Sequence, residues 1–326
     1  MSKQPTIVVT GTAGFIGSVM VQLLNEKGLT DLLLVDDFGV EGKRKNWELK
    51  NYTKVIERQA FLDKLLNNEY EIDIIIHLGA RTDTTEFNYA IHEELNLAYS
   101  KALWHYATAK QIPLIYASSA ATYGSGEHGY DDSHAVLDQL QPLNPYGVSK
   151  NEFDKWAIAQ TKHPPLWTGL KFFNVYGPNE AHKGRMASVI FHAFNQIKLD
   201  GVVKLFKSHR PEFKDGEQLR DFIYVKDVLS VLIHFFVTRK NNGLYNLGTG
   251  ECRTFLDLAT AVFSAMDKPV NVQFVDMPLD IRDRYQYHTQ ANMQRLIAAG
   301  FKQPFTPLEV AVADYVQGYL QPHRYL

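Results

Sequence analysis

The sequence predicts an α/β fold in which helices cover both faces of a doubly wound parallel sheet, with a smaller C-terminal lobe. In the first half, short β-rich apolar runs alternate with longer segments whose apolar residues recur at helical spacing. The expected strands lack polar alternation, which is typical of strands buried on both faces. A glycine-rich turn, Gly11 to Gly17, joins the first expected strand to the first expected helix. Together these features predict a Rossmann-type sheet.

The expected elements follow the chain in order. Strands are expected at residues 6–10, 32–36, 72–78, 114–118 and 170–175, and helices at 15–27, 61–68, 94–110 and 145–161. Further strand or helix signals cover 221–224, 243–247, 254–266 and 270–274, and the Gly-, Pro- and charge-rich tract 206–220 is expected to be a long surface loop. We expect a dinucleotide-binding domain at 1–172, rejoined by segments near 221–247, and a mainly substrate-binding lobe at 173–326.

Composition limits the classes of partner. The 326 residues carry 34 Lys and Arg against 36 Asp and Glu, so the chain offers no positive field for nucleic acid. The longest apolar stretches fall short of the roughly 18 to 20 residues that cross a bilayer. The first five residues leave no room for a secretion signal. We therefore expect a cytoplasmic protein with no nucleic acid, membrane or metal partner, and the single cysteine, Cys252, agrees with a reducing compartment.

The glycine-rich turn has the spacing G-x-x-G-x-x-G, formed by Gly11, Gly14 and Gly17. Glycines let the backbone turn sharply and approach a pyrophosphate, whose charge meets free amides at the start of the helix. Asp36 ends the next expected strand, where an acid accepts hydrogen bonds from a ribose. The turn therefore predicts dinucleotide binding, with an ordinary glycine turn as the weaker interpretation.

The residues after the second strand favour opposite cofactors. Asp36 and Asp37 would accept from ribose hydroxyls and repel a 2′-phosphate, which favours NAD. Lys43, Arg44 and Lys45 follow closely, and such a cationic run would pair with that phosphate, unless it is only a solvated loop. Charge alone leaves the choice between NAD and NADP open.

Tyr146 and Lys150 form a candidate catalytic pair. They follow Pro145, which suits the first turn of a helix, so their spacing of four places both on one helical face. A free tyrosine titrates near about pH 10, but an adjacent ammonium and an oxidised nicotinamide stabilise its phenolate. Tyr146 would then accept a hydroxyl proton while hydride leaves.

The expected strand 114–118 runs into Ser118 and Ser119, at the edge where open α/β sheets bind ligands. Ser119 is therefore a candidate hydroxyl for the reacting oxygen, with a turn serine as the alternative. This context makes Tyr146 and Lys150 more than a core tyrosine beside a surface lysine.

Several longer stretches carry a resemblance to a known family. They are HLGARTDTTE at 77–86, YASSAATYG at 116–124, FNVYGP at 173–178, HKG at 182–184, MASV at 186–189 and FH at 191–192. With these stretches the chain resembles the extended short-chain dehydrogenases and, among them, is similar to the ADP-glycero-manno-heptose 6-epimerases over nearly its whole length. The HKG stretch and the residues after it separate this group from general sugar-nucleotide epimerases.

The resemblance implies roles for individual residues. Tyr146 and Lys183 would be acid/base residues, Ser119 their supporting hydroxyl and Lys150 a cofactor-binding residue. Further cofactor contacts are implied for Phe15, Ile16, Asp36, Asp37, Lys43, Arg58, Leu78, Gly79, Ala80, Arg81, Thr82, Asn96, Val175 and Lys183, beside Gly11, Gly14 and Gly17. Substrate contacts are implied for Ser119, Asn174, Arg185, His192, Phe206, Lys207, Ser208, Arg220 and Tyr285. Members of the group usually prefer NADP, so NADP is the expected cofactor and NAD the alternative.

The implied reaction converts ADP-D-glycero-D-manno-heptose to ADP-L-glycero-D-manno-heptose at C6″ by transient oxidation and re-reduction, for lipopolysaccharide core synthesis. The resemblance also implies a homo-oligomer, with a pentamer as one expected order. The chain departs from the familiar pattern at Asp37, at Arg185 and in the longer tract 208–219, which puts the nucleotide and sugar in doubt.

Two other activities on the same scaffold compete with this interpretation, together with a non-catalytic cofactor sensor. Ser119 precedes Ala120 and Ala121 where 4,6-dehydratases carry an Asp-Glu pair, which disfavours dehydration. A UDP-hexose 4-epimerase is disfavoured mainly by the HKG stretch. A sensor would be expected to have lost Tyr146 or Lys150, and both are present.

Overall fold

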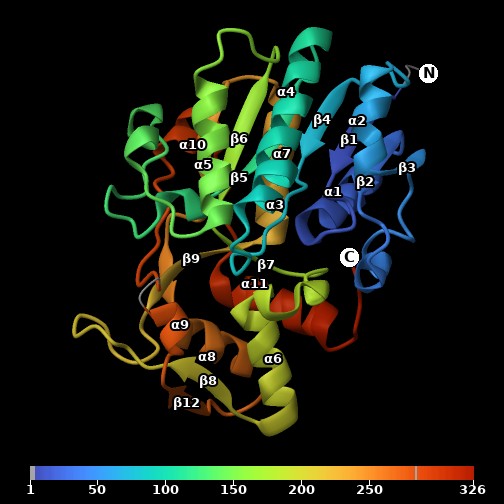
Figure 1. Cartoon of the computed structure of the whole chain (residues 1–326). Helices are drawn as coiled ribbons and strands as arrows, with labels where there is room; N and C mark the ends of the chain where they lie inside the picture. The colour runs from blue at the N-terminus through green and yellow to red at the C-terminus, as the bar shows by residue number, and fades with distance from the viewer. Residues whose placement is uncertain (1–3, 283–284) are drawn as a thin grey trace.

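The computed structural model describes residues 4–282 and 285–326. Its largest element is a seven-stranded sheet in the order β10-β6-β5-β4-β1-β2-β3 (Figure 1). All neighbouring pairs are parallel. The strands are β1 (Ile7–Thr10), β2 (Leu32–Asp36), β3 (Lys54–Glu57), β4 (Ile74–His77), β5 (Leu114–Ser119), β6 (Trp167–Phe172) and β10 (Gly243–Leu247). The predicted parallel α/β fold is confirmed.

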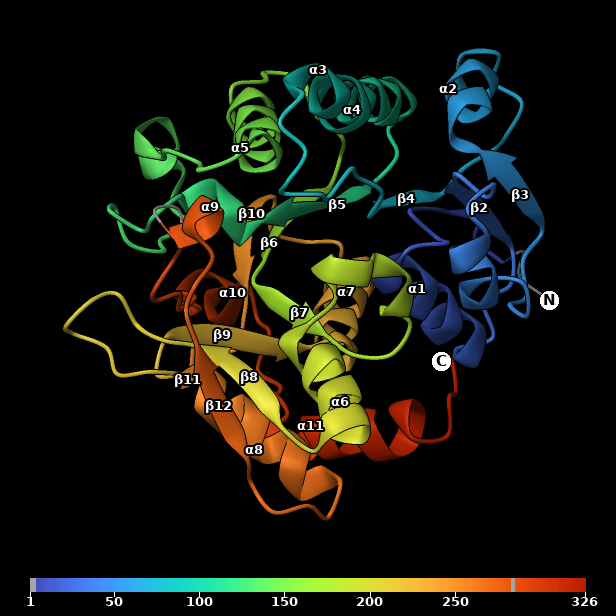
Figure 2. The same cartoon turned by 60° about the horizontal axis from the view of Figure 1, so that its bottom comes forward.

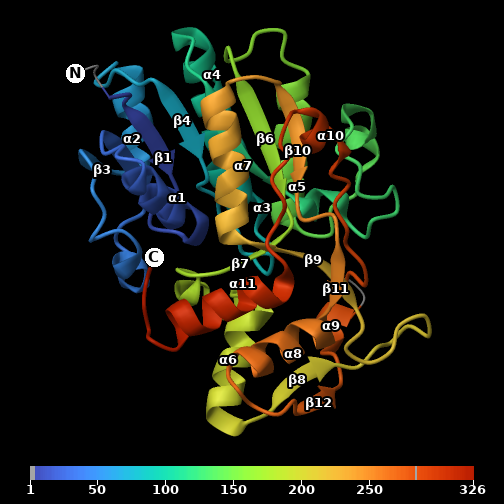
Figure 3. The same ribbon diagram turned by 180° about the vertical axis from the view of Figure 1, so that it is seen from behind.

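Helices cover both faces of this sheet, as the absence of polar alternation predicted. In Figure 2, α2 (Arg58–Leu66), α4 (Tyr99–Lys110) and α5 (Pro145–Ile158) lie on one face. Figure 3 shows α1 (Phe15–Glu26) and α7 (Val225–Thr238) on the other face. Every residue of β1 and β4 is buried, because these central strands have helices above and below. The described residues include no helix long and apolar enough to cross a membrane.

A smaller lobe lies beyond the carboxyl ends of the main strands (Figure 2). It contains a sheet of order β11-β9-β7 and the pair β12-β8. Its strands are β7 (Asn174–Tyr176), β8 (Val203–Phe206), β9 (Leu219–Tyr224), β11 (Cys252–Thr254) and β12 (Val272–Val275). Its helices are α6 (Val189–Asp200), α8 (Phe255–Ala265), α9 (Leu279–Arg282) and α11 (Leu308–Tyr315), and α10 (Gln294–Ala298) lies beside β10. The division of the chain at residue 172 stays a prediction.

The expected strand at residues 170–175 is wrong. Residues 170–175 do not form a single strand, because the chain leaves the main sheet after Phe172 and joins the second sheet at Asn174. The Phe173 amide still bonds to the Leu247 carbonyl at 3.0 Å, and β7 then pairs with β9. The apolar residues indicate that the chain is buried before and after it changes sheets. They do not indicate which strand it pairs with in each sheet.

Two further differences concern helices and a loop. The expected helix 94–110 begins earlier, as α3 (Tyr89–His92) followed by a π-helical stretch at Glu93–Ala98 that leads into α4. The expected loop 206–220 covers residues 207–218, since β8 ends at Phe206 and β9 begins at Leu219. This loop packs on Tyr287, whose hydroxyl accepts from the His209 amide at 2.9 Å and whose ring lies 5.2 Å from that of Phe213.

A fully buried ion pair joins α5 to β6. The Lys171 ammonium lies 2.7 Å from the Asp154 carboxylate, and both side chains are 0% exposed. Asp154 also accepts from the Ser118 hydroxyl at 2.6 Å and the Tyr116 hydroxyl at 3.1 Å, and Lys171 donates to Thr122 at 2.8 Å. The carboxyl end of β5 is therefore fastened to α5 by a satisfied polar network.

Replacing Lys171 by methionine is expected to lower the free energy of unfolding by about 3–5 kcal/mol, because it leaves the Asp154 charge buried without its partner. Urea unfolding of the two proteins measures the difference. The double variant Asp154→Leu with Lys171→Met is the control and should recover most of the loss, since removing both charges is often nearly neutral. A single variant as stable as the wild type would contradict the expectation.

Candidate functional site

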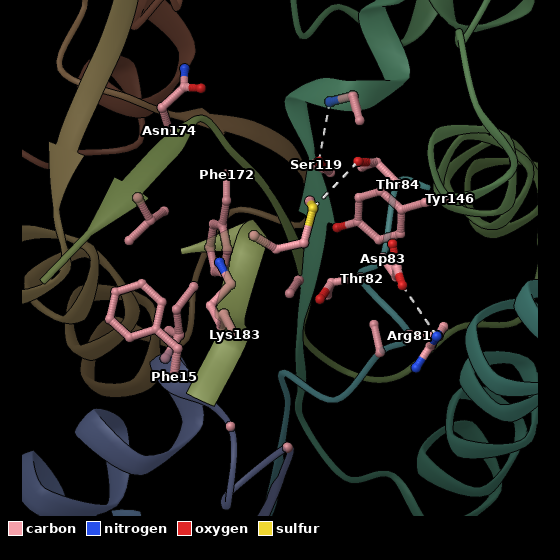
Figure 4. Close-up of a pocket in the computed structure, with 18 of the residues that line it drawn as sticks. Phe15, Arg81, Thr82, Asp83, Thr84, Ser119, Tyr146, Phe172, Asn174 and Lys183 are labelled. Carbon is pink, nitrogen blue, oxygen red and sulfur yellow. Dashed lines mark hydrogen bonds and ion pairs between the residues drawn. The ribbon is translucent and has the colours of Figure 1, made fainter. Parts of the chain in front are cut away.

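A cavity of about 1380 Å³ lies between the carboxyl ends of the main strands and the smaller lobe. Its lining includes Thr10, Asp36, Ser119 and Phe172, at the ends of β1, β2, β5 and β6, and Arg220 from β9. Figure 4 shows Ser119 and Tyr146 on one side of this space and Lys183 and Phe15 on the other. The volume is larger than a typical ligand pocket of roughly 300–1,000 Å³, so it has room for a cofactor and a substrate together.

Most predicted site residues line this cavity, although they come from distant parts of the chain. The lining includes Gly11, Gly14, Phe15, Ile16, Gly17, Asp36, Asp37, Lys43, Arg58, Leu78, Gly79, Ala80, Arg81, Thr82, Ser119, Tyr146, Lys150, Asn174, Val175, Lys183, Arg185, Arg220 and Tyr285. Five predicted residues lie outside it: Asn96, His192, Phe206, Lys207 and Ser208. Of these, Phe206 has its ring centroid 6.2 Å from that of Tyr285, in an edge-on arrangement. The Lys207 ammonium lies 3.2 Å from the Asp276 carboxylate.

The glycines of the glycine-rich turn allow it to pack closely against neighbouring backbone at the start of α1. Gly11 has φ +76°, and a Cβ there would lie 2.7 Å from the Gly79 nitrogen, so no larger residue fits. A Cβ on Gly17 would overlap the Gly11 carbonyl oxygen. The N-cap residue of α1 is Gly14, which has no side chain with which to cap the helix. This end of the helix therefore fits an anionic pyrophosphate.

Asp36 organises the end of β2. Its Oδ2 accepts from the Ala13 amide at 2.8 Å, and its Oδ1 accepts from the Asp37 amide at 2.7 Å. The Lys43 ammonium lies 3.4 Å from the same Oδ1. Arg58 also lines the cavity, and its Nε is buried without a hydrogen-bond partner among the described residues. Two cations, Lys43 and Arg58, and two acids, Asp36 and Asp37, thus line the cavity where a cofactor's adenosine ribose is expected.

The end of β4 is held by a chain of polar side chains. The Thr10 hydroxyl accepts from the Gly79 amide at 3.0 Å and lies 2.7 Å from His77 Nδ1, while His77 Nε2 lies 2.9 Å from the Ser100 hydroxyl. Burial, with the Lys150 charge, lowers the pKa of His77 to about 3, so this histidine is neutral at physiological pH. His77 therefore acts as a neutral hydrogen-bonding group behind the cavity wall.

Asn96 supports the wall from behind. It lies in the π-helical stretch before α4 and is 1% exposed. Its amide accepts from the Arg81 amide at 2.7 Å and donates to the Arg81 carbonyl at 3.0 Å and to the Ser149 hydroxyl at 3.0 Å. Asn96 thus joins the loop after β4 to the helix that carries Tyr146, and a contact with a cofactor stays a prediction for it.

Tyr146 and Lys150 lie in the first turns of α5, as their spacing predicted. Asn144 caps this helix by accepting from the Gly147 amide at 2.9 Å, and Pro145 is its first residue. Burial raises the pKa of Tyr146, and a hydrogen bond with Ser119 opposes that rise. Burial also lowers the pKa of Lys150 to about 8, and its ammonium donates to the Ala117 carbonyl at 2.8 Å. The phenol, the serine hydroxyl and the ammonium therefore meet at the end of β5.

Lys183 lies in a 3-10 turn, η5 (Ala181–Met186), on the facing side of the cavity. Its ammonium sits over the ring of Phe15, 5.5 Å from the centroid. Burial lowers its pKa, and the nearby Glu180 carboxylate opposes that change. A lowered pKa makes the Lys183 ammonium a better proton donor than an exposed lysine, and its place in the cavity makes it a candidate acid/base group.

The lobe side of the cavity presents a buried guanidinium. Arg220 is 7% exposed and donates to the backbone carbonyls of Leu219, at 2.9 Å, and Gln286. It also lies over the ring of Tyr285 at 5.2 Å and that of Phe255 at 5.6 Å. Nearby, Asn174 donates to the Asp221 carbonyl at 3.1 Å. Rings and carbonyls thus fix the Arg220 plane, an arrangement suited to phosphate recognition.

Other residues that line the cavity carried no motif and were missed. They include Thr10, Val40, Asp83, Thr84, Thr85, Phe87, Met186, Phe222, Phe255, Gln286 and Thr289. The stretches HLGARTDTTE and MASV contain several of these, so the quoted resemblance marked the segments without marking the residues. Among the described residues, no group of three or more His, Cys, Asp or Glu is placed to hold a metal ion.

The model of one protein family, described as the NAD dependent epimerase/dehydratase family, matches residues 7–248. An ADP-L-glycero-D-manno-heptose-6-epimerase of Fusobacterium nucleatum is 47% identical to this chain over 324 residues. The match covers 96% of this chain and 98% of that relative.

Two solved structures show how far the fold alone reaches. The crystal structure of an ADP-L-glycero-D-manno-heptose-6-epimerase of Helicobacter pylori superposes with a TM-score of 0.81 at 26% identity, covering 98% of each chain. A UDP-N-acetylglucosamine 4-epimerase of Methanobrevibacter ruminantium gives the same TM-score at 23% identity, covering 98% of this chain and 99% of its own. The fold therefore does not separate the two reactions, whereas the 47% identity to the Fusobacterium nucleatum relative favours the heptose epimerases.

Proposed function

This chain belongs to the NAD dependent epimerase/dehydratase family and, within it, to the ADP-L-glycero-D-manno-heptose-6-epimerases, and on that premise we propose a specific reaction and site. The proposed reaction inverts C6″ of ADP-D-glycero-D-manno-heptose to give ADP-L-glycero-D-manno-heptose. One observation carries the mechanism: Tyr146 and Lys183, two proton-exchanging groups, face the same cavity from opposite sides (Figure 4).

The chemistry of the carbon explains why a redox cofactor is needed. A carbon that bears a hydroxyl and a hydrogen, with no neighbouring carbonyl, has no acidic proton to remove. The bound nicotinamide cofactor supplies a hydride acceptor and then a hydride donor, and it is regenerated in each cycle. The configuration changes if the oxidised carbon presents its other face before hydride returns.

Tyr146 is proposed to exchange the hydroxyl proton on one face. The Ser119 hydroxyl lines the same cavity as Tyr146 and lowers the pKa of the phenol, and it is proposed to bond to the reacting oxygen as well. Lys150 lies one turn along the same helix, where its ammonium donates to the Ala117 carbonyl at 2.8 Å, and it is proposed to favour the phenolate when the cofactor is bound. Burial raises the pKa of Tyr146, so this charge is needed for Tyr146 to act as a base.

Lys183 is proposed to exchange the proton on the other face. Turning the carbonyl moves its oxygen away from Tyr146, so one fixed phenol does not serve both configurations. Lys183 comes from the opposite wall, and burial lowers its pKa toward the range in which an amine accepts and donates protons.

Arg220 is proposed to bind the diphosphate of the nucleotide-sugar. Its buried guanidinium lines the cavity between the rings of Phe255 and Tyr285, which fits a bidentate contact with phosphate oxygens. Asn174 and Arg185 line the same part of the cavity and are proposed to contact the sugar. His192, Phe206, Lys207 and Ser208 stay predictions as substrate contacts.

We propose NADP as the preferred form of the pyridine nucleotide. The support is the pair of cations, Lys43 and Arg58, beside the expected ribose position, with the Arg58 Nε left unpartnered among the described residues. Asp36 accepts two backbone amides, which offsets part of its charge against a 2′-phosphate.

Replacing Lys43 by alanine is expected to weaken NADP binding by about tenfold or more while changing NAD binding little, because a charge-assisted contact to the 2′-phosphate is lost. Fluorescence titration with each cofactor measures both affinities. Lys45→Ala, from the same turn but with its ammonium over the Tyr325 ring, is the matched control. Equal losses for NADP and NAD would argue against a 2′-phosphate contact.

The reaction itself is tested by incubating the purified protein, with NADP, with ADP-D-glycero-D-manno-heptose and following the sugar by proton NMR. The L-glycero epimer should appear until the two forms reach equilibrium, without net consumption of cofactor. Absence of inversion together with turnover of UDP-galactose would favour the 4-epimerase alternative instead.

The setting of the enzyme is proposed from kinship alone. Membership in the heptose epimerases supports a cytoplasmic enzyme that makes a precursor of the lipopolysaccharide core. It also supports a homo-oligomer, for which a pentamer is one expected order. Size-exclusion chromatography with light scattering measures that order directly.

A further inference from the structure

The turn that carries Lys183 is irregular and depends on neighbours for its shape. η5 reverses at Gly184, which has φ 54° and ψ −123°, and the Ala187 amide then bonds to the Gly184 carbonyl at 3.1 Å. His182, Lys183 and Met186 of this turn are partly buried and none of its residues is fully buried, so η5 has only limited apolar packing of its own. Two buried side chains add polar contacts that hold its position.

The first is Glu180, which is 0% exposed. Its carboxylate accepts from the Gly177 amide at 3.3 Å on one side of the turn. On the other side it accepts from the Ser188 amide at 2.7 Å and the Ser188 hydroxyl at 2.6 Å. One carboxylate therefore closes the segment 177–188, and its negative charge faces Lys183 inside that segment.

The second is Asn46, the last residue of η1 (Glu41–Asn46), which is 1% exposed. Its amide donates to the Asn179 carbonyl at 3.2 Å, and that carbonyl also lies 3.1 Å from His182 Nδ1. The same amide donates to the Ala13 carbonyl at 2.9 Å. One side chain therefore holds both the glycine-rich turn and the residues next to Lys183.

Both contacts bear on the same ammonium. The amide of Ala13 is held by Asp36 and its carbonyl by Asn46, so the centre of the glycine-rich turn is fixed from both sides. Lys183 itself lies over the ring of Phe15, which belongs to that turn and is the first residue of α1. These contacts therefore fix the position of the Lys183 side chain relative to the glycine-rich turn, where the cofactor is expected to bind.

We propose that Asn46 and Glu180 are positioning residues that hold Lys183 against the cofactor-binding turn, so that the second acid/base group is placed by contacts that also shape the cofactor site. This proposal deepens the proposed function and rests on it. Neither side chain lines the cavity, so each acts through Lys183 and not on the substrate.

The proposal predicts an asymmetric defect. Loosening η5 should displace Lys183 and leave Tyr146, on α5, in place. Cofactor reduction by the epimer whose hydroxyl is deprotonated by Tyr146 should then stay near the wild-type rate. Reduction by the epimer that depends on Lys183 should fall by about a hundredfold, the scale of a misplacement of about 1 Å.

The experiment uses Asn46→Ala and Glu180→Gln in the full-length protein loaded with NADP. Each purified epimer is mixed rapidly with each variant, and the first formation of reduced cofactor is followed by fluorescence. As a readout independent of turnover, acetylation of Lys183 by acetic anhydride is quantified by peptide mass spectrometry. A displaced Lys183 should be acetylated faster in both variants than in the wild type.

Two matched controls separate positioning from a general loss of stability. Asn246→Ala removes a buried amide that donates to two carbonyls, those of Tyr130 at 2.8 Å and Asn292 at 3.1 Å, away from η5. Asp227→Asn neutralises a buried carboxylate that accepts a hydrogen bond from the Thr306 amide at 2.9 Å. Both controls should show no difference between the two epimers and no change in Lys183 acetylation.

The outcomes are distinct. In either variant, slower cofactor reduction with only one of the two epimers, together with faster acetylation of Lys183, supports the proposal. Equal slowing with both epimers, or wild-type rates with both, overturns it. If the wild-type protein inverts neither epimer, the proposed function fails instead, and the acetylation measurement still reports whether Asn46 and Glu180 hold Lys183.

Discussion

Replacing Tyr146 by phenylalanine is expected to lower the rate of epimerisation by about 10²- to 10⁴-fold, the usual contribution of a general acid/base group. In the proposed mechanism the phenol oxygen exchanges the proton of the reacting hydroxyl, and the substitution removes that oxygen and its interaction with Ser119. Phenylalanine keeps the ring and the start of α5, so cofactor affinity should remain measurable. The initial rate of inversion by NMR, with cofactor titration alongside, tests both parts.

The matched control is Tyr116→Phe. Tyr116 is 1% exposed in β5, and its hydroxyl donates to Asp154 behind the sheet, outside the cavity. This variant should lose about 1 kcal/mol of stability, as expected for one hydrogen bond, and keep its turnover. Near-wild-type inversion by Tyr146→Phe would remove Tyr146 from the mechanism.

Replacing Lys183 by methionine is expected to lower kcat for inversion in both directions by about 10²- to 10⁴-fold. In the proposed mechanism inversion passes through proton exchange on both faces of the oxidised carbon, so losing either group blocks the complete reaction. Methionine has a similar length and keeps a contact with the Phe15 ring, which the ammonium now makes at 5.5 Å. Steady-state kinetics with each epimer measure the effect.

The kinetic pattern separates this role from simple phosphate binding. If Lys183 only held a phosphate, its loss would raise KM and leave kcat nearly unchanged, since that contact is the same in the ground and transition states. Lys198→Met, an exposed lysine of α6, is the control for loss of charge and should match the wild type.

The position of the site was predictable where a local pattern reports a local geometry. The glycines at 11, 14 and 17 fall between a strand and a helix, and Tyr146 and Lys150 fall four residues apart after a proline. Each feature depends on backbone conformation over a few residues, which sequence spacing encodes directly. The elements that carry them, β1, α1 and α5, accordingly form where expected.

Contacts between distant segments were not predictable in this way. Lys43 was expected to face a cofactor phosphate, but the structure also pairs it with Asp36 at 3.4 Å. Asn96 was implied as a cofactor contact, but it bonds to Arg81 and Ser149 behind the cavity wall. In both cases the residue lies near the expected site, and its partner depends on how separate elements pack.

The sequence by itself determined the α/β class, the glycine-rich turn and the Tyr146–Lys150 pair, because helical and strand periodicity and short spacings report burial and local conformation. Tertiary structure alone decided that the chain changes sheets between Phe172 and Asn174, and that Asn46 bonds to Asn179, which is 133 residues away. A periodic pattern states which face of an element is buried. Which element covers that face depends on the packing of the whole chain.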